Sequence, residues 1–255
     1  MIKVDWETTY ELAKKKFELN YARDDEAAEM LGNLLPKNPD LEVLKSLITN
    51  RTCIVFGCGP SLEGDFYGLL KKGFLEKSTT IASDGAVSIF LQNGLFADIN
   101  VTDLDGPEKD IIKANNLGSF TVVHAHGDNI SQLKEIVPKL NGKIIGTTQK
   151  APLENVFNFG GFTDGDRATY LCAHFGPSLI ILAGMDFGVA PGHYSHTTKI
   201  EVKEDKLAFA KQLIEELAST SDINIINVTG KGEDLTGIKR VKIRELSGIL
   251  ENPPK

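Results

Sequence analysis

Two kinds of hydrophobic pattern alternate along most of the chain. Short runs of apolar and β-branched residues fall at 52–56, 79–82, 98–101, 120–123, 143–146, 178–183 and 223–228. Between them lie segments whose apolar residues recur every three or four positions, at 62–70, 86–92, 108–115, 130–140, 167–175 and 205–218. Nearly continuous apolar strands that alternate with helices predict an α/β fold with a mostly parallel sheet and helices on both faces.

The first fifty residues show only the helical pattern. A first helix is predicted with Asp5 as its N-cap and an apolar stripe of Trp6, Tyr10, Ala13, Phe17 and Tyr21. Two shorter helices are predicted at 27–35 and 40–48, on either side of the break PKNPD. We therefore expect a helical N-terminal segment, 1–49, followed by a Rossmann-like α/β domain, 50–255. The segment is expected to pack against the main body or a partner subunit, with a role as a substrate lid as the alternative.

Composition and charge narrow the possible partners. The 255 residues suit one large domain or a domain with an appendage, and 41% hydrophobic with 25% charged residues is ordinary for a globular protein. Acidic residues outnumber basic ones by 35 to 28, which gives a net charge of −7 and argues against a nucleic-acid binder. A phosphate site would therefore be local, and the surplus of carboxylates raises the alternative that some of them hold cations.

Targeting and cysteine signals point to the cytoplasm. No apolar run approaches the ~20 residues that span a bilayer, and the N-terminus lacks the apolar stretch of a secretory signal, so no membrane partner is expected. The three cysteines, Cys53, Cys58 and Cys172, form no CxxC pair. Such a sparse, odd set argues against disulfides and against a structural zinc site, and for a reducing compartment.

Five of the predicted strands end in unusual residues. The motifs that follow them are GCGPS, SDGA, TDLDG, HAHGDN and GMDFG, whereas the turns that lead into the strands are mostly plain. The carboxyl ends of parallel strands lie along one edge of an open sheet, and ligands bind in the crevice there. The sequence therefore predicts a ligand site at this edge.

The first motif, GCGPSL, has two interpretations. Gly57 and Gly59 allow a sharp turn and a close approach to a ligand, and Pro60 and Ser61 begin a helix whose free N–H groups favour an anion. A plain tight turn is the equal alternative. The motif differs from a dinucleotide fingerprint because Leu62 stands where the third glycine belongs.

The aspartates after the second and third predicted strands suggest a metal site. Asp103 and Asp105 lie two residues apart, so an extended strand exit points them the same way. Such neighbours repel unless a cation or proton compensates them, and carboxylates suit Mg²⁺. The alternative is that Asp105 caps the helix after Gly106-Pro107. Asp84 joins the pair if the two strands are neighbours, or instead binds a ribose hydroxyl.

HAHGDN offers two histidines that lie two residues apart. His124 and His126 suit contact with phosphate or substrate, proton transfer, or a transition metal, although no further Cys or His stands at ligand spacing. The alternative is a polar turn capped by Asp128 or Asn129.

GFTDGDRA begins a predicted helix. One of its aspartates, Asp164 or Asp166, is expected to be the N-cap, and Thr163 lies beside them. Arg167 is expected to grip a phosphate, with a surface ion pair as the alternative. In the last motif Asp186 is placed to bond a heterocycle, and His193 and His196 fall in the loop after it.

Taken together, the motifs resemble those of a known enzyme family. The stretch IASDGAVSIFLQNGLFADINVTDLDG, 81–106, resembles thiamine pyrophosphokinases. The whole set, across 52–228, more closely resembles the archaeal-type 6-hydroxymethyl-7,8-dihydropterin pyrophosphokinases. The Gly-x-Gly-Pro-Ser turn is also shared with glycosyltransferase-like proteins. Thr102 stands where thiamine pyrophosphokinases have glycine, and Gly106 where they have serine, which weakens thiamine as the acceptor.

The resemblance implies an Mg²⁺-dependent transfer of diphosphate from ATP to the hydroxymethyl group of a reduced pterin, with release of AMP, in a folate or methanopterin pathway. It implies that Asp84, Asp103 and Asp105 form the metal and phosphate cluster. The backbone of Gly59 to Ser61 is expected to cradle phosphate or ribose, Arg167 to add positive charge, and His126 or a carboxylate to accept the hydroxyl proton. The remaining expected nucleotide contacts are Gly57, Thr163, Asp164 and Asp186.

Other functions remain open at this point. The rivals are a nucleotide-sugar-dependent glycosyltransferase-like protein, a thiamine pyrophosphokinase-like enzyme, a nicotinamide-binding module and a non-catalytic nucleotide-binding regulator. The expected partners are small-molecule substrates, and a homo-oligomer is neither predicted nor excluded.

Overall fold

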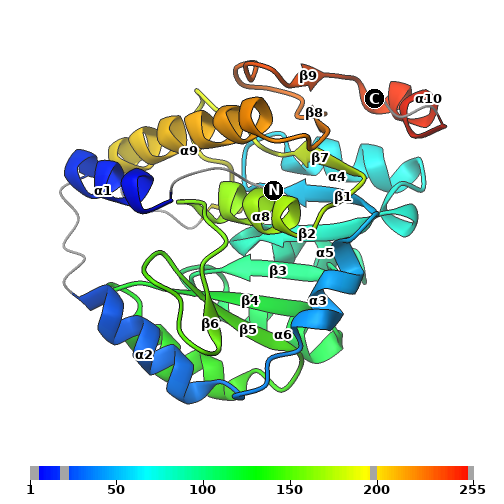
Figure 1. Cartoon of the computed structure of the whole chain (residues 1–255). Helices are drawn as coiled ribbons and strands as arrows, with labels where there is room; N and C mark the ends of the chain where they lie inside the picture. Colours follow the sequence, from blue (N-terminus) through cyan, green and yellow to red (C-terminus); the bar gives the residue numbers. More distant parts are fainter. Residues whose placement is uncertain (1–5, 18–22, 196–199, 252–255) are drawn as a thin grey trace.

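The computed structural model describes residues 6–17, 23–195 and 200–251 and contains one nine-stranded sheet within them (Figure 1). The strand order is β6-β5-β4-β3-β2-β1-β7-β8-β9, and all neighbouring strands are parallel. The strands are β1 (Thr52–Phe56), β2 (Thr79–Ser83), β3 (Ile99–Thr102), β4 (Phe120–Ala125), β5 (Ile144–Thr148), β6 (Val156–Phe157), β7 (Leu179–Ala183), β8 (Ile225–Asn227) and β9 (Lys239–Arg240).

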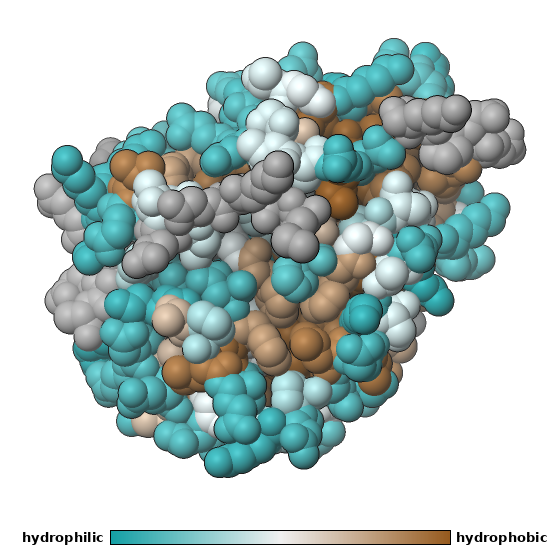
Figure 2. Space-filling view, in the orientation of Figure 1, coloured by the Kyte–Doolittle hydropathy of each residue, from teal (hydrophilic) through white to brown (hydrophobic). Residues whose placement is uncertain are grey.

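Helices cover both faces of the sheet. They are α1 (Trp6–Phe17), α2 (Asp24–Leu34), α3 (Leu41–Ile48), α4 (Leu62–Lys71), α5 (Val87–Gln92), α6 (Glu108–Leu117), α7 (Ile130–Ile136), α8 (Asp164–His174), α9 (Ile200–Thr220) and α10 (Leu246–Glu251). One core holds residues of α2, α4, α5, α6, α7 and α10, and the other holds residues of α1, α3, α8 and α9. Figure 2 shows the outer surface on the side of α1, α8 and α9. This surface is largely hydrophilic, with an apolar area near the centre of the view.

The strands alternate between the two cores. In β1, Ile54 and Phe56 belong to one core, whereas Cys53 and Val55 belong to the other, and all four are fully buried. This double burial explains why the strands are apolar almost throughout. The predicted α/β architecture with a parallel sheet is confirmed.

The elements follow the predicted pattern with small shifts. All seven predicted strands form, within two residues of the predicted ends. The helix predicted at 130–140 ends at Ile136 and continues as a 3-10 turn, Val137–Lys139, because Pro138 has no N–H to donate. Helix α8 begins three residues earlier than predicted. Strands β6 and β9 were not predicted, since two residues carry no periodic signal.

The N-terminal helices pack directly on the rest of the protein. A Cβ atom built on Gly146 of β5 would lie 2.8 Å from Leu35 Cδ1 and 2.9 Å from Leu31 Cδ2, so glycine lets this part of the chain approach the sheet closely. The Trp6 ring of α1 lies beside the Tyr170 ring of α8, with 6.2 Å between their centroids. The predicted packing against the main body is confirmed, whereas Asp5 and Tyr21 lie outside the described residues.

The sheet topology brings the predicted motifs together. Strands β2 and β3 are neighbours, with Ser83 opposite Val101, and β1 and β7 are neighbours, with Phe56 opposite Ala183. Their carboxyl ends therefore meet at one edge, as expected for an open parallel sheet. Among the described helices, none has the length and apolar character needed to cross a membrane.

Candidate active site

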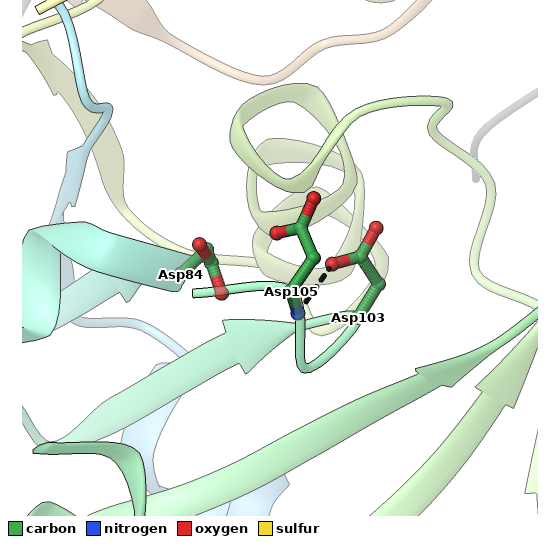
Figure 3. A group of neighbouring side chains, drawn as sticks. All are labelled: Asp84, Asp103 and Asp105. Carbon is green, nitrogen blue, oxygen red and sulfur yellow. Dashed lines mark hydrogen bonds between the residues drawn. The ribbon is translucent and has the colours of Figure 1, made fainter. Parts of the chain in front are cut away.

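Three carboxylates meet at this edge of the sheet (Figure 3). Asp84 follows β2, and Asp103 and Asp105 follow β3. Each of the three offers an oxygen atom, and these oxygens all lie within 4.8 Å of one another. The cluster forms because β2 and β3 are adjacent, which was the condition that the sequence left open.

Hydrogen bonds to a buried threonine hold the cluster in shape. Thr102 Oγ1 donates to Asp84 Oδ1 at 2.7 Å and accepts the N–H of Leu104 at 2.8 Å. The backbone of Asp105 donates to Asp103 Oδ1 at 3.2 Å. Asp84 and Leu104 have positive φ angles of 42° and 69°. Strained backbone of this kind persists where its surroundings hold it, and it is common at functional sites.

Gly106 makes room for the carboxylate of Asp84. A Cβ atom built on Gly106 would lie 2.3 Å from Asp84 Oδ2 and 2.5 Å from Oδ1, closer than real atoms approach. Any side chain at position 106 would displace Asp84 or the loop. A serine, which thiamine pyrophosphokinases have at this position, does not fit the present arrangement.

Asp105 does not cap the helix that follows it. Helix α6 begins at Glu108, its N-cap position is Pro107, and no side chain makes a capping hydrogen bond. The alternative reading of Asp105 as a helix cap is therefore wrong. Its carboxylate is left to face the cluster.

The carboxylates strongly affect one another's ionisation. Burial, followed by repulsion from Asp103 and Asp84, raises the pKa of Asp105 to about 8. Burial and the charge of Asp103 also raise the pKa of Asp84. Burial opposes ionisation of Asp103 as well, but the hydrogen bond and charge of His126 outweigh it and lower the pKa of Asp103. Such a set favours a bound cation, which relieves the repulsion.

His126 reaches the cluster from the loop after β4. Its Nε2 lies 3.4 Å from Asp103 Oδ2. Asn129 secures the loop, because its Oδ1 accepts the N–H of His126 while its Nδ2 donates to the carbonyls of Asp103 and His124. Asn129, not Asp128, occupies the N-cap position of α7. The structure therefore places His126 beside the cluster, and its catalytic role stays a prediction.

His124 lies in a different environment. It is only 2% exposed, and its Nδ1 lies 3.1 Å from Thr147 Oγ1. Burial, followed by the charge of Arg167, lowers the pKa of His124 well below its ordinary value. Among the described side chains, the only cluster with metal-ligand spacing is the aspartate triad, so the two histidines do not form a zinc site there.

The start of α8 differs from the prediction. Its N-cap is Thr163, not an aspartate, and Asp166 in the third helical position accepts the N–H groups of Phe162 and Thr163. A threonine cap with an acidic partner three residues later satisfies two N–H groups at once. Asp166 is thus committed to the helix start.

Arg167 is buried behind the cluster. Its guanidinium donates to Asp164 Oδ1 at 3.0 Å and to the carbonyl of Phe162 at 2.9 Å, and within the described ranges its Nε has no partner. The ion pair with Asp164 is therefore buried, where a surface pair was the alternative. The charge of Arg167 helps to lower the pKa of Asp103. Direct contact of Arg167 with phosphate stays a prediction.

The GCGPSL turn is tied to the neighbouring strand exit. Gly59 donates its N–H to the carbonyl of Gly184, and Ser61 donates its N–H and its hydroxyl to Asp186 Oδ2. A Cβ atom on Gly59 would lie 2.1 Å from that same carboxylate oxygen. The expectation that free N–H groups of Gly59 and Ser61 face an anion is not met, because adjacent β1 and β7 let the two loops bond each other and Pro60 has no N–H.

A pocket lies between these loops and the starts of α8 and α9. It holds about 720 Å³ of empty space, including the part open to solvent. The residues that line it include Gly57, Gly59, Thr163 and Asp164, together with Asp84 and Asp105 of the cluster. The pocket adjoins the aspartate cluster, so a ligand inside it reaches the carboxylates.

Two further pocket residues carry polar groups. Asp186 is 6% exposed, and its Oδ1 has no hydrogen-bond partner among the residues that the structure describes. Lys203, from the first turns of α9, also lines the pocket. Sequence reasoning missed Lys203 because it lies within a helix and outside any strand-exit motif. His193 is exposed beside Tyr194, and His196 lies outside the described residues.

Comparison with known sequences gives a consistent result. Residues 29–192 match the model of a family described as 6-hydroxymethylpterin diphosphokinase MptE-like. A Pyrococcus furiosus protein named 6-hydroxymethyl-7,8-dihydropterin pyrophosphokinase is 40% identical over 231 residues, which cover 87% of this chain and 96% of that protein. A Methanocaldococcus jannaschii protein of the same name is 38% identical over 238 residues, covering 87% and 98%.

Comparison with solved structures reports on the fold alone. The MAf glycosyltransferase from Magnetospirillum magneticum AMB-1 matches with a TM-score of 0.53 and 12% identity. The match covers 86% of this chain and 39% of that much longer one. At such low identity the likeness supports the α/β architecture and does not extend to glycosyl transfer.

Proposed function

Since the chain belongs to the MptE-like family of 6-hydroxymethylpterin diphosphokinases, we propose that its aspartate cluster is the centre at which diphosphate passes from ATP to the hydroxymethyl group of a reduced 6-hydroxymethylpterin. The observation that carries this proposal is the meeting of Asp84, Asp103 and Asp105 beside one pocket. The chemistry of such a transfer requires positioning and charge neutralisation rather than a covalent intermediate.

The donor set fits Mg²⁺. Three carboxylates with oxygens within 4.8 Å of one another are hard ligands of the kind that Mg²⁺ takes together with phosphate oxygens. The absence of a side chain at Gly106 keeps Asp84 in place, and the raised pKa values of Asp84 and Asp105 mark a repulsion that a cation removes. Bound there, Mg²⁺ would neutralise triphosphate charge.

The neighbouring side chains position the cluster. Thr102 orients Asp84, and His126 contacts Asp103. His126 is also the nearby group that we assign to accept the hydroxymethyl proton. Arg167, held by Asp164, supplies fixed positive charge behind the carboxylates.

The part of the pocket lined by Asp186 suits a heterocycle. Asp186 Oδ1 is a buried acceptor without a partner, while Asp186 Oδ2 is fixed by Ser61. The exocyclic amino group of adenine, or the amino and ring N–H groups of a reduced pterin, match such an acceptor. Buried polar groups without partners are costly, so a ligand that donates here gains affinity and orientation.

The test is to follow AMP. The protein is incubated with ATP, MgCl₂ and reduced 6-hydroxymethylpterin, and the nucleotides are separated by chromatography. The proposal predicts AMP and pterin diphosphate in equal amounts, and no reaction with EDTA. Formation of ADP, turnover with thiamine in place of the pterin, or metal-independent turnover would each contradict it.

A further inference from the structure

Lys203 lines the pocket beside the aspartate cluster and belongs to α9. It lies in the first turns of α9 and lines the pocket together with Asp84, Asp105 and Asp164. Within the described part of the chain, it is the only lysine or arginine that lines this pocket. It also lies beyond residue 192, where the match to the family model ends.

The ammonium group of Lys203 has no direct partner among the described residues. No carboxylate in those ranges lies within 4.0 Å of it, whereas Arg167 is committed to Asp164 at 3.0 Å. Burial alone would lower the pKa of Lys203, but the charges of Asp164, Asp105 and Asp103 raise it. The side chain is therefore a charged, half-buried donor without a fixed acceptor among the described residues.

The charge balance indicates what such a donor binds. A cation held by the three aspartates would repel the ammonium group of Lys203. With the metal bound, Lys203 would therefore not form an ion pair with these carboxylates. An anion in the pocket would lie between the bound cation and the ammonium group of Lys203 and would attract both. Charge-assisted hydrogen bonds from lysine to phosphate oxygens serve this role in many phosphate sites.

We propose that Lys203 is a catalytic residue that binds a non-bridging oxygen of the diphosphate group transferred from ATP. This inference rests on the proposed function. In the transfer, the hydroxymethyl oxygen forms a bond to the β-phosphorus, and its proton passes to His126, the acceptor assigned above. The bond from the β-phosphorus to the oxygen that bridges the α-phosphorus breaks, and that oxygen leaves on AMP. The positive charge of Lys203 offsets the negative charge of the diphosphate group that is transferred.

The experiment compares ligands with and without the transferred group. Binding of Mg²⁺ with α,β-methylene-ATP, which is not cleaved, and of AMP is measured by calorimetry for the wild type, Lys203→Met and Lys203→Arg. Lys206→Met is the matched control, because Lys206 lies one turn further along α9, is half-buried and does not line the pocket. AMP binding reports that each variant is folded.

Lys203→Met is expected to weaken binding of the ATP analogue about tenfold or more, the scale of one charge-assisted hydrogen bond, and to leave AMP binding within about twofold. Lys203→Arg is expected to restore most of the loss, and Lys206→Met to change little. Unchanged binding of the ATP analogue in Lys203→Met, or equal losses in Lys203→Met and Lys206→Met, would overturn the role proposed for Lys203. Neither result would affect the proposed function of the aspartate cluster. No magnesium-dependent binding of the analogue by the wild type would overturn the proposed function with it.

Discussion

The backbone of Gly106 lies directly against the carboxylate of Asp84, so closely that a Cβ atom at position 106 would fall 2.3 Å from Asp84 Oδ2. The two residues belong to different strand exits, after β2 and β3, that the sheet places side by side. The position of Asp84 within the cluster therefore depends on the absence of a side chain twenty-two residues later in the chain.

Gly106→Ala is expected to displace Asp84 and to lower the rate of AMP formation on the order of a hundredfold, as misplacement of a reacting group by about 1 Å does. The matched control is Gly64→Ala, because a Cβ atom at position 64 meets nothing within 4 Å. Rates close to wild type in Gly106→Ala would show that Asp84 does not have to occupy its present position.

Asp103→Asn and Asp105→Asn are expected to lower turnover by about a hundredfold or more, since a bound metal contributes several kcal/mol to charge neutralisation. Both proteins should stay folded, because the substitutions also remove repulsion among the carboxylates. Turnover and the thermal midpoint are measured together. Asp128→Asn, on the exposed part of the neighbouring loop, is the control that should keep its rate.

Magnesium binding is expected to release protons. In the metal-free protein the pKa of Asp105 is about 8, so below that pH the carboxyl is protonated and a cation must displace the proton. Affinity for Mg²⁺ should therefore rise with pH by about tenfold per unit for one displaced proton, and level off above pH 8. Calorimetry at pH 7 in buffers of different ionisation enthalpy measures the release. If Asp105→Asn no longer releases a proton, the released proton is assigned to Asp105. An affinity of the wild type for Mg²⁺ that does not change with pH would contradict the prediction.

Asp24 is expected to position the loop that carries His126. The carboxylate of Asp24 is 1% exposed, and it accepts hydrogen bonds from Gly127 N–H at 2.6 Å, Gln149 at 2.7 Å and Tyr10 at 2.9 Å. It thus joins two N-terminal helices to the exits of β4 and β5. Asp24→Asn would replace one acceptor oxygen by a donor and should lower the free energy of unfolding by about 1–3 kcal/mol.

A positioning role for Asp24 has a second signature. At temperatures where Asp24→Asn is fully folded, kcat should fall while the KM for ATP changes little, because Asp24 does not line the pocket proposed for the nucleotide. Asp25→Asn is the control, since Asp25 is an exposed neighbour that pairs with Lys150. Equal kcat values in the two variants would leave Asp24 a purely structural residue.

The sequence predicted the parallel sheet and the pairing of Asp103 with Asp105, because both follow from pattern. Strands buried on both faces are continuously apolar, and motifs at their carboxyl ends converge whenever the strands are parallel. Asp84, Asp103 and Asp105 could therefore be grouped once β2 and β3 were taken as neighbours. The strand order itself required the structure.

Other features could not be predicted, because they depend on contacts between distant segments. The N–H groups of Gly59 and Ser61 looked available for an anion, but Gly184 and Asp186, more than a hundred residues later, occupy them. Lys203 carries no local motif, and it reaches the pocket because α9 packs against α8, which begins at the same pocket. Arg167 was expected to contact phosphate. In the structure its guanidinium is buried and donates hydrogen bonds to Asp164 and to the carbonyl of Phe162.

The gathering of Asp84, Asp103 and Asp105 around one metal-bound triphosphate is tested most directly by crystallography with anomalous scattering. Crystals of the protein with Mn²⁺ and α,β-methylene-ATP are measured at the manganese absorption edge. We predict an anomalous peak within bonding distance of oxygens from these aspartates and from the phosphates. A triphosphate bound with its metal elsewhere, and with the three carboxylates in contact with neither, would contradict the assignment of this site.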